Sequence, residues 1–448
     1  MRGIGAIVLL VVAAACARPA ATREPAAPPR PLLILISLDG WRWDYDTRAP
    51  APHLRALAAR GVRADGLIPS YPSKTVPNHY TIATGLHPGH HGMVANVIRD
   101  PQTGRLFERT NRTEVEDPMW WGGDPIWNTA QRAGFIAATM FWPGSEAPVG
   151  GMRPRYWREF DDFLPGTDRV NQVLAWLDLP LAERPHFITL YLNDVDTMGH
   201  WYGPGSRQVY DAIVSTDALL GTLFAGLSSR NLIDTANIVV VSDHGMADTT
   251  RANTIVVDDY VSIADVEIAD INPTLGVTPK PGKEDEVLRR LTTAHPHLKM
   301  YRRDESPAHW HFRGQPRVPP VTGVADEGWV VLRRPNVDEY WKRSPNGGQH
   351  GYDPGLISMR GIFVAAGPAF RQGAMVPAFE SVHVYNALAE ALHVKPSAND
   401  GNPAAVRQLL RAVTMGSRPP TQRSVWSSVV SDAPTLNQRQ PYGSSVMR

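Results

Sequence analysis

The sequence is poor in cysteine, in net charge and in long apolar runs. Its one cysteine, Cys16, cannot pair within the chain, which excludes a disulfide-stabilised scaffold. The 45 Lys and Arg residues nearly balance the 44 Asp and Glu residues, and no basic cluster appears, so charge predicts no nucleic-acid-binding surface. The apolar run from Ile4 to Ala15 is shorter than the roughly 20 residues of a membrane span. Hydrophobic residues nevertheless make up 43% of the 448 residues, enough for a large core, which excludes wholesale disorder.

The amino terminus predicts an exported protein. Arg2, the apolar run and small residues up to Cys16 are typical of a secretory leader over residues 1–16. The stretch Ala13-Ala14-Ala15-Cys16 also resembles a bacterial lipobox, so Cys16 is either a lipid anchor or the remnant of simple cleavage, the alternative being a short buried helix. A Pro/Ala-rich linker covers residues 17–31. Because large secreted eukaryotic enzymes usually carry several disulfides, we expect a bacterial envelope protein, periplasmic or lipid-anchored.

Residues 32–415 predict one large domain of α/β class. Apolar runs typical of buried strands lie at 31–38, 187–192, 237–241 and 362–366, and helical spacing follows at 51–60 and 207–227. Such alternation favours a mostly parallel central sheet flanked by helices. Residues of about 250–345 break the pattern, with short strands at 254–258 and 329–333 and a helix at 284–291, and we interpret them as an inserted cap. Residues 416–448 form a Ser/Pro/Gln-rich tail outside the core.

Four short segments concentrate side chains that ligate metals. They contain Asp39, then Asp196 with His200, then Asp243 with His244, and finally His350, each in a turn with glycine. Asp39 and the Asp243-His244 pair follow predicted strands, and ligands of parallel sheets bind beyond the carboxyl ends of strands. Aspartate and neutral histidine are zinc ligands. An isolated Asp or His is more often a cap or a structural residue, so it is the recurrence that predicts a metal site.

A fifth segment offers a nucleophile. Thr75 lies in a predicted turn ahead of a helix that we expect to begin near Asn78. A threonine hydroxyl attacks only when a base or a metal ion activates it, and no obvious base adjoins Thr75 in sequence. The alternative role for Thr75 is to cap that helix.

Several blocks together resemble one family. They are SLDGWRWDY (37–45), PSKTVPNHYTIATGLHPGHHGMVAN (72–96), MFWPGSE (140–146), YLNDVDTMGHWYGP (191–204), VVSDHGM (240–246) and GQHGYDP (348–354). In content and order they look like the signature of the nucleotide pyrophosphatase/phosphodiesterase family, within the alkaline phosphatase superfamily. The resemblance covers residues of about 32–405 and implies an alkaline-phosphatase-like fold.

The resemblance implies a two-zinc hydrolase. Asp39, Thr75, Asp243 and His244 would hold one Zn²⁺, and Asp196, His200 and His350 the other. Thr75 would attack phosphorus to give a phospho-threonine that water then hydrolyses, and Asn96 would donate its amide to the phosphate. The implied substrate is a nucleotide or a similar small phosphodiester.

Substrate recognition departs from the family pattern at one position. Val76 stands where nucleotide-cleaving members usually have Phe, which stacks on the base. Tyr156 and Phe160 lie where the family supplies the opposite wall, with core packing as the alternative. Other hypotheses are a phosphomonoesterase, a lipid-headgroup phosphodiesterase acting on glycerophosphocholine-type substrates, and a secreted binding module without catalysis. No arginine is evident that would clamp a dianionic monoester, which favours diesters.

Overall fold

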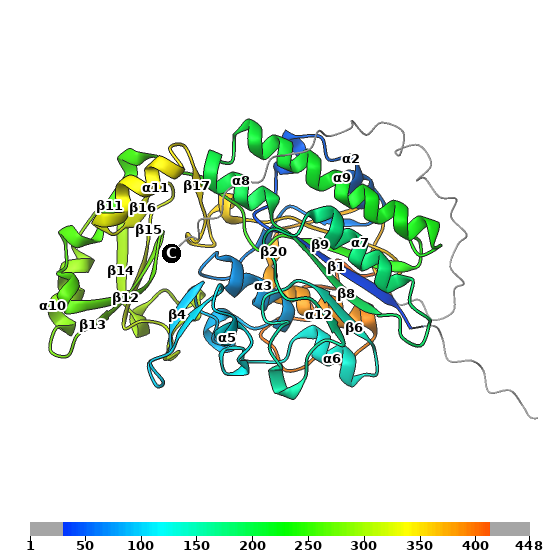
Figure 1. The fold of residues 1–448 in the computed structure, drawn as a ribbon, viewed down its shortest axis with the longest axis horizontal. Helices are drawn as coiled ribbons and strands as arrows, with labels where there is room; N and C mark the ends of the chain where they lie inside the picture. The colour runs from blue at the N-terminus through cyan, green and yellow to red at the C-terminus, as the bar shows by residue number, and fades with distance from the viewer. Residues whose placement is uncertain (1–29, 413–448) are drawn as a thin grey trace, which may run out of the picture. The chain divides into compact units, whose positions relative to one another are not determined.

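The computed structural model describes residues 30–412. The predicted leader with Cys16, nearly all of the predicted linker and the predicted tail lie outside the described residues. The described part is built around an eight-stranded sheet whose strand order is β19-β2-β18-β9-β1-β8-β6-β7 (Figure 1). These strands are β1 (Leu32–Leu38), β2 (Val62–Ala64), β6 (Ala137–Met140), β7 (Tyr156–Trp157), β8 (Phe187–Leu192), β9 (Ala236–Val241), β18 (Phe363–Ala366) and β19 (Ala374–Val376).

Helices cover both faces of this sheet. Their bounds are α1 (Tyr45–Arg48), α2 (Pro52–Arg60), α3 (Thr75–Thr84), α4 (Pro88–His91), α5 (Arg112–Val115), α6 (Ile126–Arg132), α7 (Gly166–Leu177), α8 (Asp194–Tyr202), α9 (Arg207–Ser229) and α12 (Val384–Leu392). Leu33 and Leu35 of β1 pack in one core with α3, α6 and α12, while Ile34 and Ile36 pack in another with α2, α7 and α9. Because β1 is buried on both faces, its apolar run is nearly continuous.

One central strand runs against the others. β9, β1, β8, β6 and β7 pair in parallel, whereas β18 is antiparallel to β9 and to β2. The predicted strand at 362–366 therefore exists, and the sheet is mostly parallel, as expected. Its direction could not be inferred, because an apolar run buried on both faces reads the same either way.

Helix α9 is long and apolar enough to cross a membrane by length and composition alone. Polar residues interrupt its sequence, so it contains no long unbroken apolar run. Its buried positions, among them Val209, Ile213 and Leu220, recur on one face and pack on the sheet. This arrangement is typical of a core helix that covers a sheet.

Residues between β9 and β18 build a second, smaller sheet (Figure 1, left). Its order is β12-β13-β15-β14, all antiparallel, with α10 packed on it around a separate core. We call residues 254–343, which contain it, the cap. The cap elements are β11 (Thr254–Val256), β12 (Val266–Ile271), β13 (Thr274–Pro279), α10 (Glu284–Thr292), β14 (Leu298–Arg302), β15 (Val321–Ala325), β16 (Val330–Leu332) and α11 (Val337–Arg343). Only β11, β16 and α10 have counterparts in the sequence analysis.

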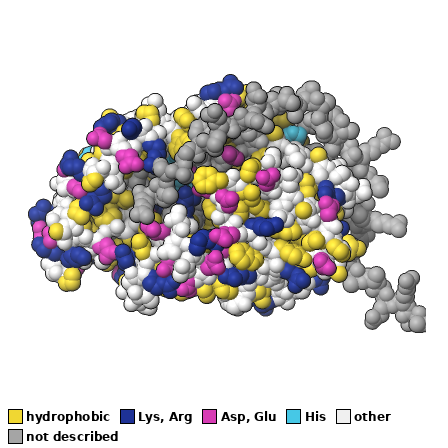
Figure 2. Space-filling view, in the orientation of Figure 1, with side chains coloured by type: hydrophobic (Ala, Val, Ile, Leu, Met, Phe, Trp, Pro, Cys, Tyr) yellow, Lys and Arg dark blue, Asp and Glu magenta, His cyan; other side chains and the backbone are white. Residues whose placement is uncertain are grey.

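Three pairs of short strands complete the described part. β3 (Leu67–Ile68) pairs with β20 (Phe379–Glu380), and β4 (Val97–Arg99) pairs with β5 (Leu106–Glu108). β10 (Ala247–Asp248) pairs with β17 (Gly348–Gln349), so the chain enters and leaves the cap at one place. On the visible face, basic and acidic side chains alternate without a patch of one sign (Figure 2), in keeping with the nearly balanced composition.

Candidate active site

The candidate site lies where three parallel strands end. Leu38 is level with Leu192 and Ser37 with Val241, so the residues that follow β1, β8 and β9 come out at one edge of the sheet. Asp39 follows β1, α8 with Asp196 and His200 follows β8, and Asp243 with His244 follows β9. Side chains that the chain separates by about two hundred positions are thereby brought together, as expected at the carboxyl edge of a parallel sheet.

Glycine at position 40 permits the close approach of β1 and α8. Gly40 has a φ of +65°, and a Cβ there would lie 2.8 Å from both Cα and Cβ of Asp196. Any other side chain would therefore clash as well as strain the backbone. The turn Asp39-Gly40 thus allows the carboxylates of Asp39, after β1, and Asp196, in α8, to share one site.

Asp196, His200 and His350 form one group whose ligand atoms all lie within 4.8 Å of one another. The Nε2 atom of His200 is 3.5 Å from Asp196 Oδ2, and His350 Nε2 is 3.7 Å from Asp196 Oδ1. Asp196 and His200 are one turn apart on α8, which places both on one helix face. His350 reaches the group from the segment after β17.

Asp39, Asp243 and His244 form the adjoining group. The Nε2 atom of His244 is 2.9 Å from Asp243 Oδ2 and 3.5 Å from Asp39 Oδ1, and all three side chains are buried. The two groups are contiguous, because Asp39, Asp196 and His244 also satisfy the spacing of metal ligands. The rings of His244 and His350 stack with centroids 3.5 Å apart.

Backbone carbonyls orient all three histidines in the same way. Nδ1 of His200 donates to Gly348 O at 3.1 Å, Nδ1 of His244 to Gly245 O at 2.9 Å, and Nδ1 of His350 to Ser73 O at 2.8 Å. This pattern assigns the ring proton to Nδ1 and leaves Nε2 with a lone pair, as in metal-bound histidines.

These lone pairs face other electron-rich atoms. The Nε2 atoms of His200 and His350 are only 3.1 Å apart. Three carboxylate oxygens of the site, Asp39 Oδ1, Asp196 Oδ1 and Asp243 Oδ2, are buried and accept no hydrogen bond from the described residues. Buried charges of one sign are stable only when paired or bound to a cation. The donor set therefore fits metal ions, and its mixture of carboxylate and imidazole is one that zinc accepts.

Burial and crowding shift the pKa values of the group. Burial raises the pKa of Asp39 well above its usual value, and the charges of Asp243 and Asp196 raise it further. Burial would also raise the pKa of Asp243, but His244 and His79 outweigh it and hold that pKa below the usual value. Burial lowers the pKa of His350 well below its usual value, with help from His244 and His200. Burial would lower the pKa of His244, but the charge of Asp243 outweighs it and raises that pKa. Metal binding requires an unprotonated ligating nitrogen, which the lowered pKa of His350 favours.

Thr75 is the first residue of α3, not part of a turn before it. The helix spans Thr75–Thr84, three residues earlier than the sequence analysis predicts, and its N-cap is Lys74. The capping role considered for Thr75 is therefore wrong. Instead, Thr75 Oγ1 lies 3.3 Å from His244 Nε2. The hydroxyl thus borders the group formed by Asp39, Asp243 and His244.

Asn96 lies beside Thr75. Its Oδ1 accepts the backbone N–H of Val76 at 3.0 Å. Since the amide oxygen is engaged in this way, the NH₂ end of Asn96 is left to donate to a ligand. The loop that ends the 72–96 block is thereby fastened to the first turn of α3.

The structure separates the three residues predicted for the substrate walls. Val76 is 4% exposed and belongs to the core below α3. Phe160 is half-buried, and its ring centroid is 5.9 Å from that of Tyr191, whose hydroxyl donates to Asp39 Oδ2. Tyr156 is not brought to the site: it pairs with Ala138, in register with Ile34, five residues before Asp39. Its ring stacks near Trp176 and its hydroxyl donates to Glu183 O, which is the core-packing alternative.

Two residues of the site escape the sequence analysis. Tyr191 is level with Ser37 on the neighbouring strand, so strand pairing would have been needed to find it. His79 lies one helical turn after Thr75, a spacing that sequence does offer as a signal. Nδ1 of His79 donates to Thr75 O at 2.9 Å and Nε2 bonds Ser37 Oγ at 2.7 Å. Asp39, His79 and Asp243 also satisfy the spacing of metal ligands, with His79 Nδ1 3.4 Å from Asp243 Oδ2, but both ring nitrogens of His79 are already engaged in these hydrogen bonds.

Comparison with known proteins agrees with this geometry. A family model described as type I phosphodiesterase / nucleotide pyrophosphatase matches residues 33–353. The chain is 37% identical over 407 residues to venom phosphodiesterase CdcPDE of Crotalus durissus collilineatus, covering 88% of this chain and 48% of that protein. It is 33% identical over 398 residues to ectonucleotide pyrophosphatase/phosphodiesterase family member 5 of Homo sapiens, covering 89% and 82%. The chain thus spans about half the length of the venom phosphodiesterases.

Solved structures show the same fold. Murine ectonucleotide pyrophosphatase/phosphodiesterase 5 superposes with a TM-score of 0.80 at 33% identity, covering 85% of this chain and 100% of that one. The human protein gives the same TM-score at 34% identity. One of the murine structures is an inactive threonine-to-alanine variant in complex with AMP. The predicted alkaline-phosphatase-like α/β fold is confirmed.

Proposed function

The chain belongs to the type I phosphodiesterase / nucleotide pyrophosphatase family, and we propose that it is a two-zinc hydrolase of small phosphodiesters and nucleotide phosphoanhydrides. The observation that carries this proposal is the position of Thr75 Oγ1, 3.3 Å from His244 Nε2 at the border of the metal-type cluster. The inactive threonine-to-alanine variant of the murine relative supports a threonine nucleophile.

Thr75 is the nucleophile in this proposal. Its hydroxyl loses its proton to solvent and attacks phosphorus in line, so that the bond from Oγ1 to phosphorus forms as the bond from phosphorus to the alcohol or phosphate leaving group breaks. Water then hydrolyses the phospho-threonine. The first turn of α3 fixes the direction of attack, because His79 and Asn96 both bond the backbone of residues 75–76. Holding the reacting atoms in line in this way is itself a large part of the rate enhancement.

Asp39, Thr75, Asp243 and His244 would hold one ion, and Asp196, His200 and His350 the other. When bound, the ions supply positive charge that lowers the pKa of a hydroxyl or water and stabilises the charge developing on phosphate oxygens. Asn96 adds a neutral donor from its NH₂ end, with the Thr75 backbone N–H beside it. Tyr191 holds Asp39 in place through its hydroxyl.

Phosphodiesters are favoured over monoesters. A dianionic monoester is usually clamped by an extra cation, and the lysine next to the nucleophile is not available for this. Lys74 Nζ lies 2.7 Å from both carboxylate oxygens of Asp270 in the cap. Nucleotides are the favoured substrates for two reasons. The murine relative binds AMP, and Phe160 packs near Tyr191, whose hydroxyl bonds Asp39. A glycerophosphocholine-type substrate remains the alternative on the same scaffold.

The decisive experiment is Thr75→Ala assayed with bis-p-nitrophenyl phosphate. We expect no hydrolysis above background, whereas Thr75→Ser, which keeps the hydroxyl, retains part of the activity. Thr84→Ala is the matched control, because Thr84 ends the same helix and its hydroxyl bonds Tyr80 O and Leu86 N, away from the candidate site. Hydrolysis by Thr75→Ala at the rate of the control would refute the role of Thr75 as nucleophile. Zinc content is measured for each variant, so that a loss of activity through loss of bound zinc is distinguished from loss of the nucleophile.

Substrate class is tested by a panel of kcat/KM values. ATP, a dinucleotide, bis-p-nitrophenyl phosphate, p-nitrophenyl phosphate and glycerophosphocholine cover the alternatives. We expect the first three to lead, and faster turnover of the monoester would overturn the diester assignment. A binding module without catalysis predicts no turnover of any of them. Export to the periplasm or the outer face of the envelope, and lipidation of Cys16, remain predictions that fractionation of cells and mass spectrometry of the mature amino terminus test.

A further inference from the structure

A buried ion pair joins the cap to the residue before the proposed nucleophile. Lys74 Nζ lies 2.7 Å from both Oδ1 and Oδ2 of Asp270, and the two side chains are only 5% and 12% exposed. Lys74 is the N-cap of α3 and directly precedes Thr75. Water screens the attraction in a buried ion pair less than on the surface, and removing one partner leaves the other charge buried and unpaired.

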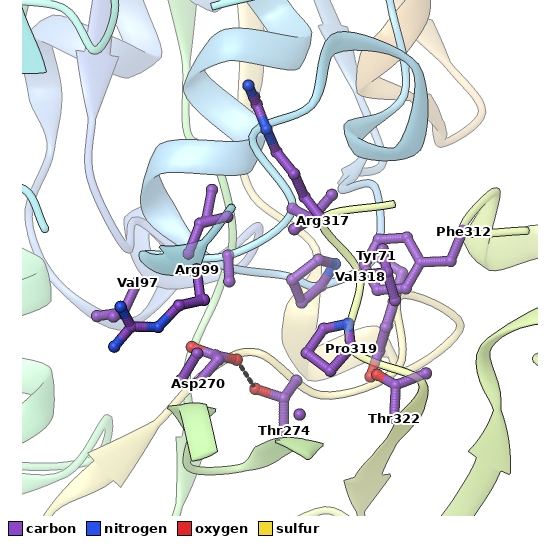
Figure 3. A pocket seen from close by; sticks show the side chains of 16 residues that line it. Tyr71, Val97, Arg99, Asp270, Thr274, Phe312, Arg317, Val318, Pro319 and Thr322 are labelled. Atoms are coloured by element: carbon purple, nitrogen blue, oxygen red, sulfur yellow. Dashed lines mark hydrogen bonds between the residues drawn. The ribbon is translucent and has the colours of Figure 1, made fainter. Parts of the chain in front are cut away.

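The cap strand is shaped to aim Asp270 at this point. Along β12, Ile268 pairs with Val277 and Asp270 with Gly276, so Ala269 is an extra residue without a partner. This is a β-bulge, a device that bends a strand and redirects a side chain. Thr274 Oγ1 donates a second hydrogen bond to Asp270 Oδ2, at 2.5 Å, which further fixes the carboxylate; Figure 3 draws this bond.

Neighbouring contacts hold the same segment. The hydroxyl of Tyr71 donates to Gly323 O of β15 at 3.2 Å, and the Tyr71 ring stacks on Trp310 with centroids 3.8 Å apart. Residues of the cap and of the main domain, Asp270 and Tyr71 among them, line a small cavity here (Figure 3). Across the segment, the stem of Lys74 passes over Gly351, where a Cβ would lie 3.1 Å from Lys74 Cε. The close approach to Gly351 restricts the conformation of the Lys74 side chain, whose ammonium group contacts Asp270.

We propose that Asp270 is a positioning residue for Thr75: by holding Lys74, it fixes the first turn of α3 and the direction of the Thr75 hydroxyl. The inference rests on the proposed nucleophile. It gives the cap a part in the chemistry that does not require the cap to touch substrate. The step from Asp270 to Thr75 runs through one covalent neighbour, so small displacements of Lys74 are passed on directly.

The same strand supplies a matched control. Glu267 of β12 pairs with Arg99 of β4, and both side chains are 39% exposed. Such exposed pairs contribute little. Glu267→Gln and Asp270→Asn therefore make the same chemical change, three residues apart, at a solvated and at a buried ion pair.

The test measures kcat and KM with bis-p-nitrophenyl phosphate, a substrate too small to need the cap for recognition. For Asp270→Asn we expect kcat to fall by about ten- to a hundredfold with KM within about threefold, because a displacement of about 1 Å at a reacting group costs on the order of a hundredfold. Glu267→Gln should match the unsubstituted protein. The pair Lys74→Met/Asp270→Asn should be no slower than Asp270→Asn, because the two residues act as one unit.

Bound zinc and thermal melting are measured for every variant. Unchanged kcat in Asp270→Asn overturns the inference, and so does a fall in kcat that zinc loss or unfolding fully accounts for. The proposed function fails separately, if Thr75→Ala still hydrolyses the substrate. When Thr75→Ala is inactive and Asp270→Asn is fully active, the nucleophile stands and only the positioning role is lost.

Discussion

Replacing Asn96 by aspartate separates the two ends of its amide. The oxygen accepts the Val76 N–H at 3.0 Å, and an aspartate oxygen can accept that bond equally well. The NH₂ end, which we propose donates to the phosphate, becomes a second oxygen with negative charge. Asn96→Asp thus keeps the structural contact and inverts the proposed catalytic one, whereas Asn96→Ala removes both.

We expect the two substitutions to lower kcat by different amounts. Loss of one donor to a transition state costs about 2.7–4 kcal/mol, or roughly a hundred- to a thousandfold in kcat, which we expect for Asn96→Ala. Asn96→Asp adds repulsion between a carboxylate and the anionic phosphate, so it should be slower still, although its fold is better preserved. Steady-state kinetics with bis-p-nitrophenyl phosphate and thermal melting of both variants measure the two effects.

The proposed donor role of Asn96 is refuted if Asn96→Asp is as active as the unsubstituted protein, or if activity follows the melting temperature across the two variants. Either result would mean that Asn96 serves only to fasten the loop to α3. A pH series distinguishes the charge effect, because protonation of the new carboxylate at acid pH should recover part of the activity relative to Asn96→Ala.

Three further predictions concern metal, pH and substrate. Removal of metal by EDTA should lower the melting temperature, and zinc at a hundredfold excess over its dissociation constant should restore about 2.7 kcal/mol per site; calorimetry that shows no shift would contradict the metal fit. Burial lowers the pKa of His91 to about 3, and the Met93 N–H donates to its Nδ1. The unfolded chain, with an ordinary pKa of about 6.5, therefore binds the extra proton first, so the free energy of unfolding should fall by about 2 kcal/mol more between pH 7 and pH 5 than in His91→Gln; equal losses in urea unfolding would count against this. Phe160→Ala should raise KM for a nucleotide by about tenfold or more with little effect on kcat for bis-p-nitrophenyl phosphate, because stacking on a base is worth about 1–3 kcal/mol; Tyr156→Ala, a core aromatic, is the control, and an equal rise in KM in both variants would remove Phe160 from the substrate wall.

The central strands and the candidate metal ligands can be predicted because two strong patterns coincide. Buried parallel strands read as apolar runs, and the candidate ligands follow those runs directly, as with Asp39 after β1 and Asp243 after β9. Asp196 and His200 add a helical spacing of four. These features are local in sequence, so no knowledge of strand order was needed to find them.

The rest depends on contacts between distant segments. Tyr191 acts on Asp39 across a strand pairing, and the carbonyls that orient the histidines belong to residues such as Ser73 and Gly348. The sequence predicts that α3 begins at Asn78, three residues later than it does, because Thr75, Val76 and Pro77 are weak helix formers. In the folded chain Asn78 bonds the carbonyls of Pro72 and Lys74 and holds the first turn. Sequence does not show that Tyr156 lies away from the candidate site, because that depends on the register in which β7 pairs with β6.

The clasp of β10 and β17 brings the two ends of the cap together. Ala247 pairs with Gln349 and Asp248 with Gly348, so about a hundred residues leave and re-enter the main domain across a single pair of strands. His244 lies three residues before β10 and His350 directly after β17, just outside that clasp. The clasp thus brings side chains from both ends of the cap to the candidate metal site. By our inference, a change within the cap preserves the rate only if the cap still presents an acid to Lys74.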